Sequence, residues 1–300
     1  MLNTMISRTL PFIPKKLVWQ FSKNYIAGET TGDAVSAALA LNREGIMVTI
    51  DILGEFIETL DQAEKNKEEY LELMAETEKN GVNGNYSIKP TMFGLLLDAE
   101  VCRRHIRDLV KKAREYGSFI RIDMEDSQCV DRTIAIFRKI KAEFPENVGL
   151  VLQAYLRRTR QDIETLIQDG LPLNLRLCKG IYVEPRRIAY KEYRNINRHY
   201  LDDLELMFKN GVYPAIATHD KPLVQGALDL IEKYQASPNQ YEFQMLYGVT
   251  PGQRKAIVAK GHKMRVYIPF GSHWFGYSTR RLKENPKMVS HIMKALLYKG

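Results

Sequence analysis

Residues 118–126, SFIRIDMED, form a short apolar run that ends in acidic residues, and residues 130–147, VDRTIAIFRKIKAEFPEN, follow it with apolar side chains at helical spacing. A second apolar run, VGLVLQAYL at 148–156, comes next. A strand, a helix and another strand in this order are typical of a βαβ unit, in which the two strands lie parallel in one sheet. This unit decides the fold because the rest of the chain repeats it.

The same alternation extends in both directions along the chain. Six further apolar runs occur at 45–53, 85–90, 173–180, 213–220, 241–248 and 264–271. Segments with helical spacing lie between or after the runs, at 55–81, 93–117, 159–170, 184–211, 221–235, 250–261 and 276–300. Eight such units in 300 residues predict an α/β fold, a closed (β/α)8 barrel of the TIM type. An open doubly wound sheet is the alternative, but it normally has a glycine-rich turn after the first strand, and DILGEF at 51–56 supplies only one glycine.

The composition fits a single domain. A chain of 300 residues with 45% hydrophobic content can bury a large core, and no linker or low-complexity tract divides it. We therefore expect an N-terminal helical arm over 1–44 and one barrel domain over 45–300, with its last helix over the barrel mouth.

The cysteines Cys102, Cys129 and Cys178 form no CxxC pair and no zinc-site spacing, which favours a reducing compartment and small core side chains.

The net charge of +8 is spread along the chain, and basic residues alternate with acids in most helical segments. This pattern favours ordinary surface charge over nucleic-acid binding. No apolar run approaches the roughly 18 residues of a membrane span, so we expect a cytoplasmic protein. The stretch up to Gly28 contains bases and no acid, with Arg8, Lys15, Lys16 and Lys23, and it is a candidate for a peripheral contact at the inner face of the membrane.

Polar side chains at strand ends are the candidates for chemistry, because the active sites of such barrels lie at the carboxyl ends of the strands. The predicted strand ends offer Asp51, Lys89, Asp123, Glu125, Asp126, Gln153, Tyr155, Arg176, Lys179, Thr218, His219, Gln244 and Tyr267. The set is rich in cations and amides, which suits an anionic ligand. We expect no metal site, because strand alternation turns neighbouring acids in opposite directions.

Several of these residues allow two interpretations. Lys89 and Lys179 are each a candidate carboxylate anchor or Schiff-base nucleophile, or else a lysine held in a salt bridge. His219, oriented by Thr218, is a candidate general base, or else a polar residue that caps its strand or contacts a ligand phosphate. Asp123 is best interpreted as the partner of a lysine or arginine across the mouth.

Adjacent arginines follow the last apolar run. Arg280 and Arg281 come shortly after Phe275 and Tyr277. Paired guanidiniums present planar, permanently charged donors, which suit a small carboxylate over apolar walls. The alternative is a solvated helix face.

Taken together, the motifs resemble the flavin-dependent proline dehydrogenases, in particular the bacterial single-function enzymes. The resemblance rests on SIKPT, RIDMED, VLQAYLRRT, RLCKGIY, ATHD, EFQMLYGV, YIPFG and YSTRRL, which occur in the order of the family. It implies oxidation of L-proline to Δ1-pyrroline-5-carboxylate by hydride transfer to bound FAD. Electrons would then pass to a membrane quinone, as the first step of proline catabolism.

The resemblance also implies roles for individual residues. Arg280, Arg281 and Lys89 would bind the proline carboxylate, and Tyr267, Tyr277 and Leu177 would wall the pyrrolidine ring. Asp123, paired with Lys89, and Arg176, near the hydride-accepting nitrogen, would be the catalytic residues. The flavin would be held by Met124, Gln153, Arg176, Lys179, Gly180, Ile181, Thr218 and His219.

The chain departs from the family at one motif. Where the family often has KGAYW, this chain has KGIYV, with Ile181 and Val183, so a tryptophan beside the cofactor is absent. Two other classes remain as alternatives: a Schiff-base lyase that uses Lys89 or Lys179 on the same barrel, and a basic barrel that binds nucleic acid or lipid without catalysis.

Overall fold

A computed structural model describes residues 19, 22–54 and 56–278. Its eight strands pair in the order β1-β2-β3-β4-β5-β6-β7-β8 and close into a barrel in which every neighbouring pair is parallel. The strands are β1 (Met47–Ile52), β2 (Gly84–Ile88), β3 (Ile120–Ile122), β4 (Val148–Gln153), β5 (Asn174–Cys178), β6 (Tyr213–Ala217), β7 (Glu242–Leu246) and β8 (Met264–Phe270). The predicted (β/α)8 barrel is confirmed, and the pairing of β1 with β8 excludes the open sheet.

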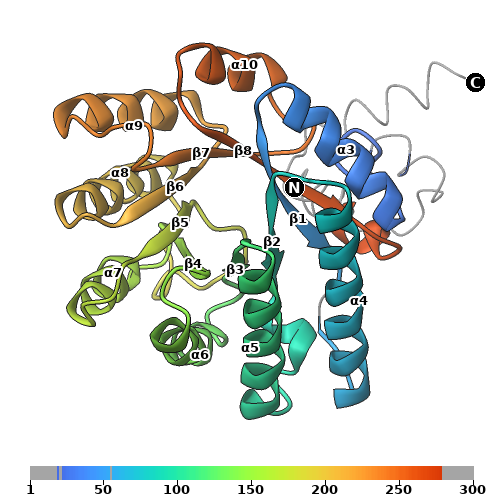
Figure 1. Ribbon diagram of the computed structural model, residues 1–300. Helices are drawn as coiled ribbons and strands as arrows, with labels where there is room; N and C mark the ends of the chain where they lie inside the picture. The colour runs from blue at the N-terminus through green and yellow to red at the C-terminus, as the bar shows by residue number, and fades with distance from the viewer. Residues whose placement is uncertain (1–18, 20–21, 55, 279–300) are drawn as a thin grey trace, which may run out of the picture.

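Helices surround the barrel on the outside (Figure 1). They are α3 (Thr31–Arg43), α4 (Leu60–Lys79), the short 3-10 helix η2 (Pro90–Phe93), α5 (Ala99–Glu115), α6 (Val130–Glu143), α7 (Thr159–Gln168), α8 (Tyr193–Lys209), α9 (Lys221–Lys233) and α10 (Pro251–Ala259). Each of α4 to α10 connects two consecutive strands, which is the order that the sequence predicts.

Helix α3 packs against β1 and β8 and closes the wall where the barrel begins and ends. A capping box fixes its start, because the Thr30 hydroxyl accepts a hydrogen bond from the backbone N–H of Asp33 and the Asp33 carboxylate accepts one from the backbone N–H of Thr30. The segment before it is tied to the end of β8, where the Ala27 N–H donates to the carbonyl of Pro269. The predicted last helix, at 276–300, lies almost entirely outside the described residues.

One predicted helix is much shorter than the sequence pattern suggests. The segment 184–211 has helical spacing throughout, yet α8 begins only at Tyr193. Glu184 instead accepts hydrogen bonds from the backbone and hydroxyl of Ser127, and Ala189 forms an isolated antiparallel bridge with Leu156. These contacts hold 184–192 as a loop beside the barrel mouth.

The core lies between the strands and the helices that cover them. Alternate strand residues such as Val48, Ile50, Val266 and Ile268 are buried, and α5 contributes a face of side chains at helical spacing. Polar side chains occupy part of the barrel interior, where Arg265 pairs with the buried Glu242 at 2.8 Å. Within the part of the chain that the structure describes, no helix is long and apolar enough to cross a membrane.

Candidate active site

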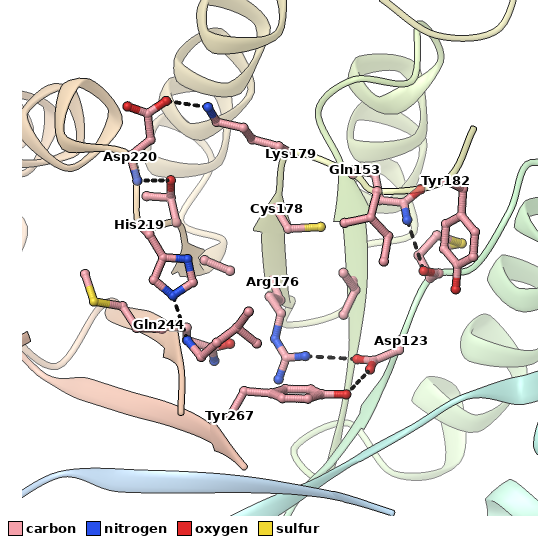
Figure 2. A pocket seen from close by; sticks show the side chains of 18 of the residues that line it. Asp123, Gln153, Arg176, Cys178, Lys179, Tyr182, His219, Asp220, Gln244 and Tyr267 are labelled. Carbon is pink, nitrogen blue, oxygen red and sulfur yellow. Dashed lines mark hydrogen bonds and ion pairs between the residues drawn. The ribbon is translucent and has the colours of Figure 1, made fainter. Parts of the chain in front are cut away.

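A cavity of about 420 Å³ opens at the carboxyl ends of the strands. The predicted site residues that line it are Lys89, Asp123, Met124, Gln153, Arg176, Lys179, Gly180, Ile181, Thr218, His219, Tyr267 and Tyr277. They come from six different strands and from the segments that follow them, so only barrel closure brings them together. Figure 2 shows most of their side chains from close by.

Arg176 and Asp123 form the central ion pair of this cavity (Figure 2). Nη1 of Arg176 donates to Oδ1 of Asp123 and to the hydroxyl of Ser87, both at 2.9 Å. The Ser87 hydroxyl donates to the same Asp123 oxygen at 3.0 Å, and the Tyr267 hydroxyl donates to Oδ2 at 3.2 Å. The Tyr267 ring also lies under the guanidinium, with 5.5 Å from its centroid to Cζ of Arg176. Each member of this network is therefore held by at least two others.

Lys89 has a different partner from the one that we expected. Its Nζ donates to both carboxylate oxygens of Asp51, at 2.7 and 2.8 Å, and not to Asp123. The physical reason is register: Asp51 is the second-last residue of β1, next to β2, whereas Asp123 already accepts hydrogen bonds from Arg176 and Tyr267. Burial alone would lower the pKa of Lys89, but the carboxylates of Asp51 and Asp123 outweigh it and raise the pKa above its usual value. A protonated lysine is a poor nucleophile, so this arrangement argues against the Schiff-base alternative at Lys89.

Three buried polar atoms in the cavity have no hydrogen-bond partner among the described residues. They are Nε and Nη2 of Arg176 and Oε1 of Gln153, whose amide nitrogen donates to the carbonyl of Met124 at 3.0 Å. Both residues are at least 95% buried, since Arg176 is 5% and Gln153 3% exposed. An unpaired buried polar atom costs free energy. Because both residues line the cavity, a polar ligand bound there is the candidate partner for these two donors and one acceptor.

A second ionic cluster lies at the rim of the cavity. Lys179 pairs with Asp220, which also accepts hydrogen bonds from the Tyr193 hydroxyl at 2.9 Å and from the Asn197 amide at 3.1 Å. Burial would raise the pKa of Asp220, but Lys179 and the two other donors outweigh it and lower the pKa. The cluster fixes the ammonium of Lys179 at the edge of the cavity, over the Tyr193 ring.

Thr218 and His219 each form a hydrogen bond with the backbone of another residue. The Thr218 hydroxyl accepts from the backbone N–H of Asp220 at 3.1 Å, and Nε2 of His219 accepts from the backbone N–H of Leu246 at 2.8 Å. Since Nε2 is an acceptor, the ring proton belongs on Nδ1. The arrangement favours the second interpretation, in which both residues shape the strand end.

Gly180 allows the chain to approach Tyr155 closely. Its φ is +104°, and a Cβ atom at this position would lie 2.1 Å from Cδ1 of the tyrosine ring. No other residue fits without displacing the ring or the loop. The turn places Ile181 and Tyr182 at the cavity wall, while Val183 beyond them is 99% exposed.

One described residue to which the family resemblance assigned a role does not line this cavity. Leu177 is fully buried and does not line it, because alternation along β5 directs Arg176 and Cys178 inward and Leu177 outward. Arg280 and Arg281 lie outside the described residues. Other residues of the site were given no role from the sequence: Asp51, Ser87 and Asp220, which hold site side chains, and Cys178 and Tyr182, which line the cavity.

Comparison with known proteins shows which family the chain is related to. The family model described as Proline dehydrogenase matches residues 34–294. The chain belongs to the proline dehydrogenase family. It is 36% identical over 278 residues to proline dehydrogenase 1 of Bacillus subtilis (strain 168), which covers 93% of this chain and 91% of that protein. It is 33% identical over 289 residues to the proline dehydrogenase of Deinococcus radiodurans, and this match covers 95% of this chain and 93% of that protein.

A solved structure agrees with the family assignment. Proline utilization A (PutA) from Bdellovibrio bacteriovorus, in a crystal structure of the protein inactivated by N-propargylglycine, superimposes with a TM-score of 0.84 at 25% identity. The match covers 89% of this chain and 33% of that longer chain. The resemblance drawn from the sequence motifs is thereby confirmed, and the cavity described above lies within the matched family region.

Proposed function

We propose that this member of the proline dehydrogenase family oxidises L-proline to Δ1-pyrroline-5-carboxylate with a bound FAD, as the first step of proline catabolism. The observation that carries the proposal is that Arg176 and Gln153 line the cavity and together carry two donors and one acceptor with no partner among the described residues. A flavin ring has carbonyl and imine acceptors and one N–H donor, so it would satisfy both residues.

The cavity residues divide into those that would hold the cofactor and those that would hold the substrate. The flavin would be held by Met124, Gln153, Arg176, Lys179, Gly180, Ile181, Thr218 and His219, all of which line the cavity. When bound, the flavin supplies the acceptor for the hydride, chemistry that no side chain offers. Arg176 would stabilise negative charge next to it, and its ion pair with Asp123 fixes the orientation of the guanidinium.

Lys89 would bind the proline carboxylate together with Arg280 and Arg281. Its ammonium keeps one N–H for the substrate, because Asp51 accepts the other two. Tyr267 and Tyr277 would wall the pyrrolidine ring, since both line the same cavity as Lys89. Hydride leaves the ring carbon next to nitrogen only when the nitrogen lone pair can form the C=N bond, so the substrate would react with its amine neutral.

The electron acceptor belongs to the same proposal. A membrane quinone would reoxidise the flavin, and the protein would work in the cytoplasm with a peripheral contact at the inner face of the membrane. This part rests on the family's usual scheme, and the cavity opening at the strand ends is compatible with access by a second substrate.

The experiment that tests this proposal measures product and cofactor separately. The protein is reconstituted with FAD, freed of excess flavin, and assayed with L-proline and a water-soluble quinone analogue, with pyrroline-5-carboxylate trapped by o-aminobenzaldehyde. Product should form with the native chain and fall at least a hundredfold in Arg176→Met. The matched control is Arg138→Met, which removes an arginine from the exposed pair with Asp169 and should leave the rate unchanged. Absence of product from flavin-loaded native protein would contradict the proposal.

A further inference from the structure

Cys178 is the last residue of β5, and its thiol lines the candidate active-site cavity (Figure 2). The residue is half-buried, whereas Cys102 and Cys129, the other two cysteines of the chain, are completely buried. Burial, above all, raises the pKa of Cys129 to about 12 and that of Cys102 still higher. Of the three thiols, only Cys178 is therefore reachable from the cavity.

The neighbours of Cys178 point to a ligand that lies against it. Cys178 is paired in register with Gln153 of β4, and Arg176 lies two residues before it on the same face of β5. Both of these residues line the cavity, are at least 95% buried and carry polar atoms with no hydrogen-bond partner among the described residues. A ligand that satisfies them both must pass directly beside the thiol.

We propose that Cys178 is a thiol-modification site at the floor of the cofactor cavity, and that its conversion to a mixed disulfide blocks the cavity against the flavin. The inference rests on the proposed function for the identity of the ligand. The reverse also follows: bound flavin covers the sulfur and protects it. Modification and cofactor loading would exclude each other at one position on β5.

The chemistry needs a small disulfide or thiosulfonate as the oxidised partner. The Cys178 sulfur loses its proton to solvent and attacks one sulfur of the reagent, a new S–S bond forms, and the second half of the reagent leaves with the electron pair of the broken bond. Excess dithiol reverses the step. The added group would lie beside Arg176 and Gln153, the two side chains proposed to hold the flavin ring, and would occupy space that the ring needs.

The test compares the flavin-free and flavin-loaded protein under the same reagent. Both forms of the full chain are treated with methyl methanethiosulfonate, digested and analysed by mass spectrometry, and flavin binding is followed by quenching of flavin fluorescence. We expect at least tenfold more methylthio label on Cys178 in the flavin-free form, and little label on Cys102 and Cys129 in either form. The labelled flavin-free protein should lose flavin binding and regain it after dithiothreitol.

Cys178→Ser serves as the control variant, compared with its own untreated sample. The reagent should leave its flavin binding unchanged, which assigns the effect to this one sulfur. Equal labelling of Cys178 with and without bound flavin, or normal flavin binding by the labelled protein, would overturn the inference and leave the proposed function intact. If untreated native protein binds no flavin, the proposed function itself fails, and that outcome is distinct because it appears before any reagent is added.

Discussion

Lys89, the residue directly after β2, and Asp51 on β1 form a buried ion pair in which one ammonium contacts both oxygens of one carboxylate, at 2.7 and 2.8 Å. Asp51 has no exposed surface, and Lys89 is 9% exposed. Desolvation makes such a pair expensive, and the mutual attraction offsets this cost only while both partners are present. The pair therefore holds Lys89 protonated and fixed at the edge of the cavity.

Removing either partner of this pair should destabilise the protein strongly. Asp51→Asn or Lys89→Met should each lower the free energy of unfolding by about 3–5 kcal/mol, because each leaves a buried charge uncompensated. The double variant should recover much of the loss without recovering proline binding. Urea unfolding of all three measures this. Lys233→Met, which removes a lysine from the exposed pair with Glu205, is the control and should change little. Additive losses in the double variant would show that the two residues are not coupled.

Gly180→Ala should impair flavin binding and stability together. The new methyl group would meet the Tyr155 ring at 2.1 Å, and an alanine at φ +104° adds backbone strain of roughly 1–3 kcal/mol. Gly252→Ala, in α10 with nothing within 4 Å of the added Cβ, is the matched control and should be neutral or slightly stabilising. Thermal unfolding and flavin titration of both variants measure the difference. Normal flavin affinity in Gly180→Ala would mean that the turn does not shape the cofactor cavity.

Tyr267→Phe should weaken catalysis and leave the cofactor in place. The change removes the hydroxyl that donates to Asp123 at 3.2 Å but keeps the ring beneath Arg176. A hydrogen bond to a charged group contributes about 1.5–3 kcal/mol, so kcat/KM for proline should fall roughly tenfold or more. Tyr234→Phe removes a hydroxyl that donates to Glu205 at the surface, and its kinetics should match those of the native protein. Equal kinetics in both variants would show that the Tyr267 hydroxyl does not contribute to catalysis.

Stability should fall as the pH rises from 5 to 8, in part because of Asp203. This carboxyl of α8 is buried, one of its oxygens has no partner among the described residues, and burial raises its pKa from 3.8 to about 7. The folded state then binds the Asp203 proton more tightly than the unfolded state does. The resulting contribution to the free energy of unfolding is complete below the pKa of the unfolded state, and it is lost as the pH rises through the pKa of the folded state.

Asp203→Asn should reduce the fall in the free energy of unfolding between pH 5 and pH 8, by on the order of 2 kcal/mol. The exposed Asp229 of α9 provides the control, since Asp229→Asn should keep the native slope. Urea unfolding at several pH values gives the comparison. The buried Glu125, whose pKa is raised by burial to about 7, contributes in the same direction, so some slope should remain. An unchanged slope in Asp203→Asn would contradict the assignment.

The fold was predictable from the sequence because its signal is local and repeated. Each apolar run and each helical segment could be found within a short window, and parallel pairing followed from their alternation. The misplaced start of α8 shows the limit of this signal, since 184–192 has helical spacing but is held as a loop by Ser127 and Leu156, which are distant in the sequence.

The site was predictable only in part. The strand-end rule and the family motifs bring Asp123, Arg176 and Lys89 to one cavity. They do not fix which carboxylate pairs with which cation, because that depends on register between neighbouring strands and on how many donors each carboxylate already has. The alternation of side chains along β5 would have predicted that Cys178 lines the cavity with Arg176 and that Leu177 does not.

The most direct test of the proposed function is an anaerobic absorbance spectrum of the flavin-loaded protein before and after addition of L-proline. Electron transfer from proline to the cofactor should bleach the visible flavin bands, and pyrroline-5-carboxylate should appear in equal amount. D-proline, added as a control at the same concentration, should bleach them far more slowly. Flavin bands that persist unchanged in saturating L-proline would contradict the account.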